Sequence, residues 1–103
     1  MKIDDVEERE LIPGTKVRFV HSDRMTVAHW HFDPNIDLPA HSHPHEQICN
    51  VIEGEFELTI DGVPEKMTAG HYRVIPPDVV HSGHSITDCT IIDVFSPVRD
   101  DYR

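Results

Sequence analysis

Three histidines occupy five positions in the stretch PAHSHPHEQ, residues 39–47, and a glutamine follows them. His41 and His43 are two residues apart, so on an extended backbone both imidazoles leave the same face. Gln47 has the same parity at the start of the next extended run. Imidazole nitrogens and an amide oxygen can both bind a divalent transition metal. His41, His43 and Gln47 are therefore candidate ligands of a metal ion.

A fourth candidate ligand, His81, follows the turn Pro76–Pro77–Asp78 at the end of a short extended run, Val79–Val80–His81. By spacing alone a His-x-His pair is a weak signal, because exposed histidines also cluster. If the four side chains converge, we expect them to hold one divalent transition metal. The mixed nitrogen and oxygen set leaves its identity open among Zn, Ni, Fe, Mn and Cu.

The elements that must position these side chains are short strands. Runs rich in β-favouring residues alternate with Pro, Gly, Asp and Asn clusters, a pattern typical of an all-β sandwich or barrel. Asp61–Gly62 has the composition of a two-residue hairpin loop. The expected strands are Lys16–His21, Met25–Phe32, Glu46–Glu53, Phe56–Ile60, Val63–Met67, His71–Ile75 and Thr90–Phe95.

Alternation in the last of these strands puts a carboxylate on a face that is otherwise apolar. Ile91, Asp93 and Phe95 share one face, and Ile92 and Val94 share the other. The pattern does not say which face meets the core. Asp93 is either an interior carboxylate or an ordinary solvent-facing residue.

Composition excludes several classes of partner. The chain has 103 residues, nineteen Asp and Glu against nine Lys and Arg, and a net charge of −10. This charge balance argues against non-specific nucleic-acid binding, which needs a basic face, and against docking to an anionic membrane. The chain also lacks a secretory leader or membrane span, so we expect a cytoplasmic protein. Cys49 and Cys89 are expected to be reduced thiols in apolar surroundings.

Two longer patterns resemble the cupin family. Residues 35–54 resemble the first cupin motif, G-x5-H-x-H-x(3,4)-E-x6-G, with His41, His43, Gln47 and Gly54 in place. Residues 70–85 resemble the second motif, G-x5-P-x-G-x2-H-x3-N, with Gly70, Pro76 and His81 in place. The resemblance implies a single cupin domain over residues 1–103, folded as a double-stranded β-helix, or jelly-roll barrel. It also implies that His41, His43, Gln47 and His81 are the metal ligands.

The departures from the two motifs differ in their expected effect on the metal site. Asn35 and Asp78 replace glycines, and both residue types tolerate left-handed backbone. Ser85 replaces a terminal asparagine that does not hold the metal. Gln47 replaces a glutamate ligand, so the ligands leave the charge of the metal uncompensated. A site of this kind should attract anions.

The ending D-x-F-x-P-x-R, with Asp93, Phe95 and Arg99, resembles small cupins of the pectin-degradation type. Members of that type convert 4,5-unsaturated monouronates to the open-chain 4-deoxy-5-keto form. The resemblance implies that Asp93 is the general acid/base, Phe95 shapes the sugar pocket and Arg99 binds the substrate carboxylate. Arg99 can alternatively form an ion pair with Asp100 or Asp101 on an exposed tail.

The remaining histidines have less defined roles. His45 is expected near the metal or at the pocket rim rather than as a ligand. His84 either lines the pocket mouth or is a plain loop histidine. His29 and His31 flank Trp30 and are expected to face solvent or a partner subunit.

Three classes of function remain. The first is a metal-dependent enzyme acting on a small anionic, sugar-derived substrate. The second is a metal-dependent dioxygenase, and the third is a non-catalytic sugar-binding or metal-binding cupin. A homodimer is expected in each case, because a small barrel gains stability from burying exposed edge strands.

Overall fold

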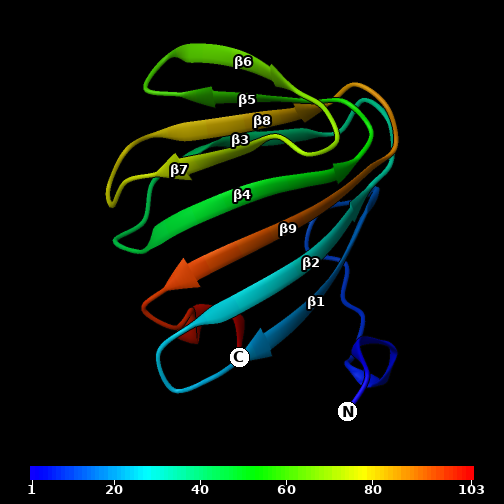
Figure 1. Ribbon diagram of the computed structural model, residues 1–103, viewed down its shortest axis with the longest axis vertical. Helices are drawn as coiled ribbons and strands as arrows, with labels where there is room; N and C mark the ends of the chain where they lie inside the picture. Colours follow the sequence, from blue (N-terminus) through cyan, green and yellow to red (C-terminus); the bar gives the residue numbers. More distant parts are fainter.

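Nine strands form two antiparallel sheets (Figure 1). The computed structural model describes all residues 1–103. The strands are β1 (Thr15–His21), β2 (Thr26–Phe32), β3 (Asp37–His41), β4 (Glu46–Glu53), β5 (Phe56–Ile60), β6 (Val63–Met67), β7 (Tyr72–Ile75), β8 (His81–Ser85) and β9 (Cys89–Ser96). Two short 3-10 helices, η1 (Ile3–Asp5) and η2 (Asp100–Tyr102), lie near the chain ends. None of the helices has the length and apolar character to span a membrane.

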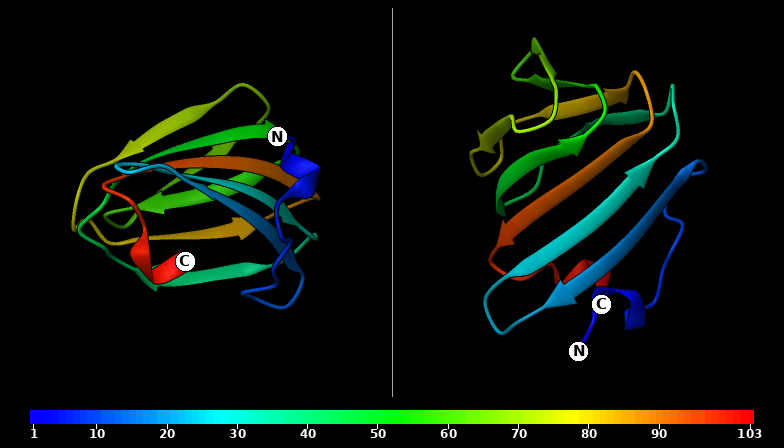
Figure 2. Two further views of the ribbon diagram at one scale, coloured as in Figure 1. Left: turned by 90° about the horizontal axis from the view of Figure 1, so that it is seen from below. Right: turned by 45° about the vertical axis from the view of Figure 1, so that its right-hand side comes forward.

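The five-stranded sheet has the order β1-β2-β9-β4-β7, and the four-stranded sheet has the order β3-β8-β5-β6. The two sheets face each other, and the chain crosses between them repeatedly (Figure 2). Strands distant in sequence are therefore neighbours, as in the pairing of β9 with both β2 and β4. The predicted all-β jelly-roll architecture is confirmed.

Two strands differ from the sequence-based expectation. The strand Asp37–His41 is not among the expected strands, and it contains Pro39. Pro39 is tolerated because β3 is an edge strand, where a missing backbone hydrogen-bond donor costs little. The extended run expected at Val79–His81 instead begins at His81 and continues to Ser85. HSGHS has low β-propensity, and pairing with β3 and β5 on its two sides stabilises it as a strand.

Tight turns set where the strands begin and end. Asp61 and Gly62 both have positive φ, 50° and 78°, as the predicted two-residue hairpin requires. Asn35 and Asp78 also adopt left-handed backbone, with φ of 61° and 66°. These two residues stand where the cupin motifs have glycine, so the substitutions preserve the turns.

The core lies between the two sheets. Fourteen buried apolar residues form one cluster, and both sheets contribute to it. Packing is close enough that a Cβ at Gly83 of β8 would collide with the Phe56 ring. The inward face of β9 carries Ile91, Asp93 and Phe95, and Asp93 is only 9% exposed. Asp93 is therefore an interior carboxylate, which resolves the alternative that alternation left open.

Candidate metal centre and cavity

Three histidine rings lie together on the inner side of the four-stranded sheet. His41 ends β3, His81 begins β8, and the two residues are directly paired. His43 follows β3 in the loop to β4. The ring centroids are 4.2 Å apart for His41 and His81, and 4.9 Å apart for His43 and His81. One ring nitrogen from each residue lies within 4.8 Å of the others, so the cluster can hold a metal ion.

Each of these rings is oriented by a hydrogen bond to the backbone. Nδ1–H of His41 donates to the Pro39 carbonyl at 2.8 Å, and Nδ1–H of His81 donates to the Val79 carbonyl at 2.9 Å. Nδ1–H of His43 donates to the His45 carbonyl at 3.0 Å. A carbonyl only accepts, so these bonds place the proton on Nδ1 and leave a lone pair on Nε2. This arrangement is the one that orients histidine for a metal.

Gln47 joins this cluster from the opposite sheet. It is 6% exposed, and its Oε1 lies 3.1 Å from Nε2 of His43. Its amide group also lies close enough to Asp93 to act against the raised pKa of that carboxyl group. With the amide nitrogen toward Asp93, the Gln47 oxygen faces Nε2 of His43. Both of these atoms are then hydrogen-bond acceptors. Two acceptors in contact are stabilised by a cation that both can bind.

Two further features of the histidines fit a bound cation. Nε2 of His81 is buried and has no hydrogen-bond partner, an arrangement that costs free energy unless something binds there. Burial lowers the pKa of His81 to about 4 and also lowers the pKa of His43. Both rings are therefore neutral at pH 7, the form that binds a metal.

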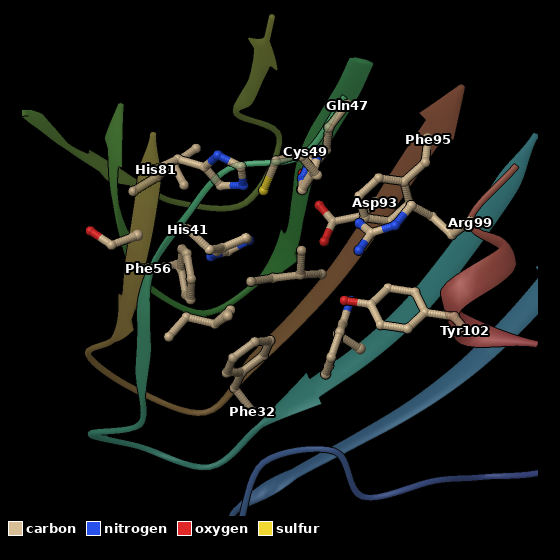
Figure 3. A pocket seen from close by; sticks show the side chains of 17 residues that line it. Phe32, His41, Gln47, Cys49, Phe56, His81, Asp93, Phe95, Arg99 and Tyr102 are labelled. Carbon is tan, nitrogen blue, oxygen red and sulfur yellow. The ribbon is translucent and has the colours of Figure 1, made fainter. Parts of the chain in front are cut away.

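Asp93 lies on the five-stranded sheet, across the cavity from the histidines (Figure 3). Burial raises the pKa of Asp93 to about 6, although the Gln47 amide and the Cys49 thiol act in the opposite direction as donors. Oδ1 of Asp93 is buried and accepts no hydrogen bond. A carboxyl group with this pKa can both accept and donate a proton near neutral pH.

Arg99 enters the same cavity from the segment after β9. Its side chain is 7% exposed and forms a bidentate ion pair with Asp101, with Nε–Oδ1 at 3.0 Å and Nη2–Oδ2 at 2.8 Å. The guanidinium also lies 4.7 Å from the Phe95 ring centroid and 4.2 Å from that of Tyr102. The expected ion pair is thus present with Asp101, whereas Asp100 pairs with Arg103.

The ion pair does not use all the donors of Arg99. Nη1 makes no hydrogen bond within the chain, while Arg99 lines the cavity. In Figure 3 the guanidinium points toward the Asp93 carboxylate. Asp101 therefore binds one edge of the Arg99 guanidinium. Nη1 remains available to donate a hydrogen bond to an anion in the cavity.

The residues described above surround a narrow cavity between the two sheets. Its walls are mostly apolar, with side chains such as Trp30, Phe32 and Leu58. The polar groups converge at one end, which is the usual composition of a small-molecule site. The cavity therefore combines a cation-binding cluster, a carboxyl group and a guanidinium.

The other histidines and the cysteines lie outside the cluster. His84 bonds Asp37 at 2.6 Å and is partly exposed, and His31 is exposed. His45 packs edge-on against the His43 ring, as expected for a residue beside the cluster. Cys49 and Cys89 are buried free thiols, which confirms that prediction. Burial, together with the charge of Asp93, raises the pKa of Cys49 well above its usual value, so this thiol stays protonated.

Sequence patterns do not identify Tyr102 as a site residue, and they leave Asp100 and Asp101 open as the partner of Arg99. Tyr102 lines the cavity and stacks on Phe19 at 4.5 Å between ring centroids. Asp101 holds Arg99, and hydrogen bonding to Arg99 lowers the pKa of Asp101. Both depend on the turn of η2, which folds the end of the chain back over the barrel. The sequence DDY carries no periodic signal for that turn.

Comparison with known proteins supports the family resemblance. The model of the cupin domain family matches residues 28–95. The pectin degradation protein KdgF of Dickeya dadantii (strain 3937) is 29% identical over 102 residues, covering 96% of this chain and 93% of that protein. The H2HPP isomerase of Bacillus subtilis is 36% identical over 62 residues, covering 59% of this chain but only 26% of that protein.

Solved structures show the same similarity in three dimensions. An RmlC-like cupin from Shewanella frigidimarina NCIMB 400 superposes with a TM-score of 0.92 at 32% identity, covering 97% of this chain and 91% of that one. KdgF from Halomonas sp. superposes with a TM-score of 0.91 at 27% identity, covering 97% of this chain and 94% of that one. Both similarities extend over nearly the whole length of each chain.

Proposed function

Because this chain belongs to the cupin domain family, we propose that it is a metal-dependent enzyme that opens the ring of a 4,5-unsaturated monouronate. The observation that carries the proposal is the buried Asp93 carboxyl group, which shares a cavity with three convergent histidines and Arg99. Similarity to two proteins named KdgF, one of them a pectin degradation protein, supports a substrate derived from pectin, and similarity to an isomerase supports a reaction without net oxidation.

In this proposal His41, His43, His81 and Gln47 hold one divalent metal ion. When bound, the ion would supply Lewis-acid polarisation of a substrate oxygen. The buried, unpartnered Nε2 of His81 and the contact between His43 and the Gln47 oxygen support this ligand set. The metal identity stays open, since the donors are nitrogen and neutral oxygen.

The proposed reaction moves one proton and gains or loses no atom. The C1 hydroxyl of the sugar loses its proton, the C1–O5 bond breaks to leave an aldehyde at C1, and the resulting C5 enolate takes up a proton at C4. The product is the open-chain 4-deoxy-5-keto acid. We propose that Oδ1 of Asp93 accepts and returns this proton. Its lack of a hydrogen-bond partner and its pKa of about 6 suit that task.

The other cavity residues bind and orient the sugar. A guanidinium binds a carboxylate in a bidentate fork, and the Arg99 guanidinium points toward Asp93 (Figure 3) with Nη1 not used in the bonds to Asp101. Phe95 supports the Arg99 guanidinium and supplies an apolar wall. The substrate carboxylate would then lie near Arg99, with the reacting carbons between Asp93 and the histidine cluster.

The direct test follows the absorbance of the unsaturated C4–C5 bond in a purified monouronate. Metal-loaded protein should accelerate its loss over the slow spontaneous reaction, and chelator-treated protein should not. Elemental analysis of the same samples identifies the ion. No acceleration by metal-loaded protein would refute the proposed reaction.

A substitution at Gln47 tests whether the neutral ligand matters. Gln47→Glu should retain the metal, because a carboxylate is a good ligand, but it removes one unit of positive charge from the site. The substitution also places a second carboxylate close to that of Asp93. We expect affinity for uronate, measured by thermal-shift titration, to fall by roughly tenfold or more. Unchanged anion affinity with full metal content would contradict this role.

Asp101 is expected to position Arg99 rather than to contact substrate. Asp101→Asn should weaken the bidentate ion pair and raise KM for the uronate roughly threefold to tenfold, with little change in kcat. Asp100→Asn is the matched control, because Asp100 pairs with Arg103 and not with Arg99. Equal effects from the two variants would show that Asp101 does not act through Arg99.

A dioxygenase is the second candidate function, favoured by the three convergent imidazoles, which also suit redox metals such as Fe and Cu. The two functions differ in their need for Asp93, since oxygen chemistry does not require a proton shuttle. Oxygen uptake by the iron-loaded or copper-loaded protein, together with an inert monouronate, would favour the dioxygenase.

A further inference from the structure

The Tyr102 side chain brings a hydroxyl group into the cavity from η2, the short helix at the end of the chain. Two contacts fix its ring. The ring stacks on Phe19, with the ring centroids 4.5 Å apart and an angle of 22° between the planes. The guanidinium carbon of Arg99 lies 4.2 Å from the Tyr102 ring centroid. In Figure 3 the hydroxyl points into the cavity, on the side where Asp93 and Arg99 lie.

The contacts of the Tyr102 ring do not account for its hydroxyl group. A phenylalanine ring would also stack on Phe19 and lie against the Arg99 guanidinium. The hydroxyl is the part of the side chain that enters the cavity, whose walls are mostly apolar. A small number of polar groups in such a pocket usually fixes the orientation of a ligand. The Tyr102 hydroxyl is therefore a candidate ligand-binding group.

A carboxylate is the ligand group that suits a hydroxyl in this position. Arg99, beside Tyr102, uses Nε and Nη2 to bind Asp101, so only part of its donors can reach an anion in the cavity. A carboxylate has two oxygens that together accept about four hydrogen bonds, so it can use a second donor next to the guanidinium. Asp93, when ionised, repels an anion in the same cavity, and a further donor offsets part of that repulsion.

We propose that Tyr102 is a substrate-binding residue whose hydroxyl donates a hydrogen bond to the substrate carboxylate beside Arg99. The choice of a uronate as the ligand rests on the proposed function, whereas the placement of the hydroxyl beside Arg99 does not. Together the hydroxyl and the guanidinium distinguish a uronate from a neutral sugar of similar shape. A neutral sugar would leave both donors without a carboxylate to bind, which is an effective basis for discrimination.

Arg9 positions Tyr102 from the other end of the chain. Its Nη1 donates to the Tyr102 carbonyl at 2.6 Å, and its guanidinium carbon lies 5.4 Å from the Phe19 ring centroid. The backbone of Arg9 is itself bound to Val17 of β1 by two hydrogen bonds, at 2.9 and 2.8 Å. Arg9 is not a cavity residue, so it would act on a ligand through Tyr102.

Binding of D-galacturonate to the metal-loaded protein tests the role of the hydroxyl. This saturated uronate has the carboxylate but no C4–C5 double bond, so its binding is measured apart from the reaction. Tyr102→Phe should raise its Kd in isothermal titration calorimetry roughly tenfold or more, because a hydrogen bond to a charged group is lost. Tyr72→Phe is the matched control, since it removes the only other tyrosine hydroxyl, which lies on β7 in a residue that is 65% exposed. Galactose, which has no carboxylate, should bind Tyr102→Phe and the wild type equally.

The galacturonate measurement separates this inference from the proposed reaction. A Kd that depends on the Tyr102 hydroxyl, in a protein that does not open an unsaturated monouronate, would refute the reaction and support the role of Tyr102. Ring opening by the wild type together with an unchanged galacturonate Kd in Tyr102→Phe would overturn the role of Tyr102 alone. Equal weakening by Tyr72→Phe, or no binding of galacturonate to the wild type, would also overturn it.

The role of Arg9 is tested in the same assay. Arg9→Gln should raise the galacturonate Kd roughly threefold to tenfold, and should have little further effect when combined with Tyr102→Phe, because the two residues act through one hydroxyl. Arg18→Gln is the matched control, since Arg18 binds Asp4 and Glu8 of the same N-terminal segment. Circular dichroism verifies that each variant is folded. Fully additive effects of Arg9→Gln and Tyr102→Phe would show that Arg9 does not act through Tyr102.

Discussion

Purified His81→Ala is expected to contain no stoichiometric metal. The substitution removes the buried Nε2 that has no partner within the chain, together with one of three convergent lone pairs. Loss of a residue that only orients a ligand costs roughly 10-fold to 100-fold in metal affinity, so loss of a direct ligand should cost more. Elemental analysis and the thermal shift on adding metal both measure the effect. His43→Ala should behave in the same way.

His45→Ala and His84→Ala are the controls for the ligand set. His45 contacts the His43 ring without joining the cluster, and its backbone carbonyl, which orients His43, survives the substitution. His84 bonds Asp37 instead. Both variants should retain most of the metal. Equal metal loss from His45→Ala and His81→Ala would show that the proposed ligand set is wrong.

Asp93→Asn is expected to lower kcat for ring opening by roughly 10²-fold to 10⁴-fold, the usual contribution of a general acid/base. The amide has nearly the same shape as the carboxyl group, so the fold should be preserved. Metal content should also be unchanged, because Asp93 is not among the proposed ligands. The decay of the C4–C5 absorbance at saturating substrate gives the rate, and elemental analysis of the same sample gives the metal content.

Cys49→Ala is the matched control for Asp93→Asn. Cys49 is the direct partner of Asp93 in the register of β4 and β9, and it lines the same cavity. Its pKa is raised well above the usual thiol value by burial, so it cannot replace Asp93 as a base. Cys49→Ala should therefore keep most of the activity. If Asp93→Asn were as active as the wild type, the proton shuttle would be refuted and oxygen uptake would be the next measurement.

Features set by near neighbours in the chain could be predicted from the sequence. The spacing of His41 and His43, the Asp61–Gly62 hairpin and the left-handed turn at Asp78 depend on a few adjacent residues. Alternation along β4 also places Gln47, Cys49 and Val51 on one face, and all three are buried. In each case the backbone geometry is local, so local residue types determine it.

Features that depend on pairing between distant strands were decided only by the tertiary structure. The segment HSGHS becomes β8 because β3 and β5 flank it, despite its low β-propensity. The choice of Asp101 rather than Asp100 as the partner of Arg99 follows from the turn of η2. The convergence of His41 and His81 likewise depends on the pairing of β3 with β8, which sets the two residues directly opposite each other.

Asp93 shows most directly which features the sequence determined and which the tertiary structure decided. The sequence by itself determined which residues share a face with Asp93, because side chains alternate along any strand. It could not determine which face is covered, because that depends on where the second sheet packs. The tertiary structure closes the barrel over the face of Ile91, Asp93 and Phe95, and this burial raises the pKa of the carboxyl group to about 6.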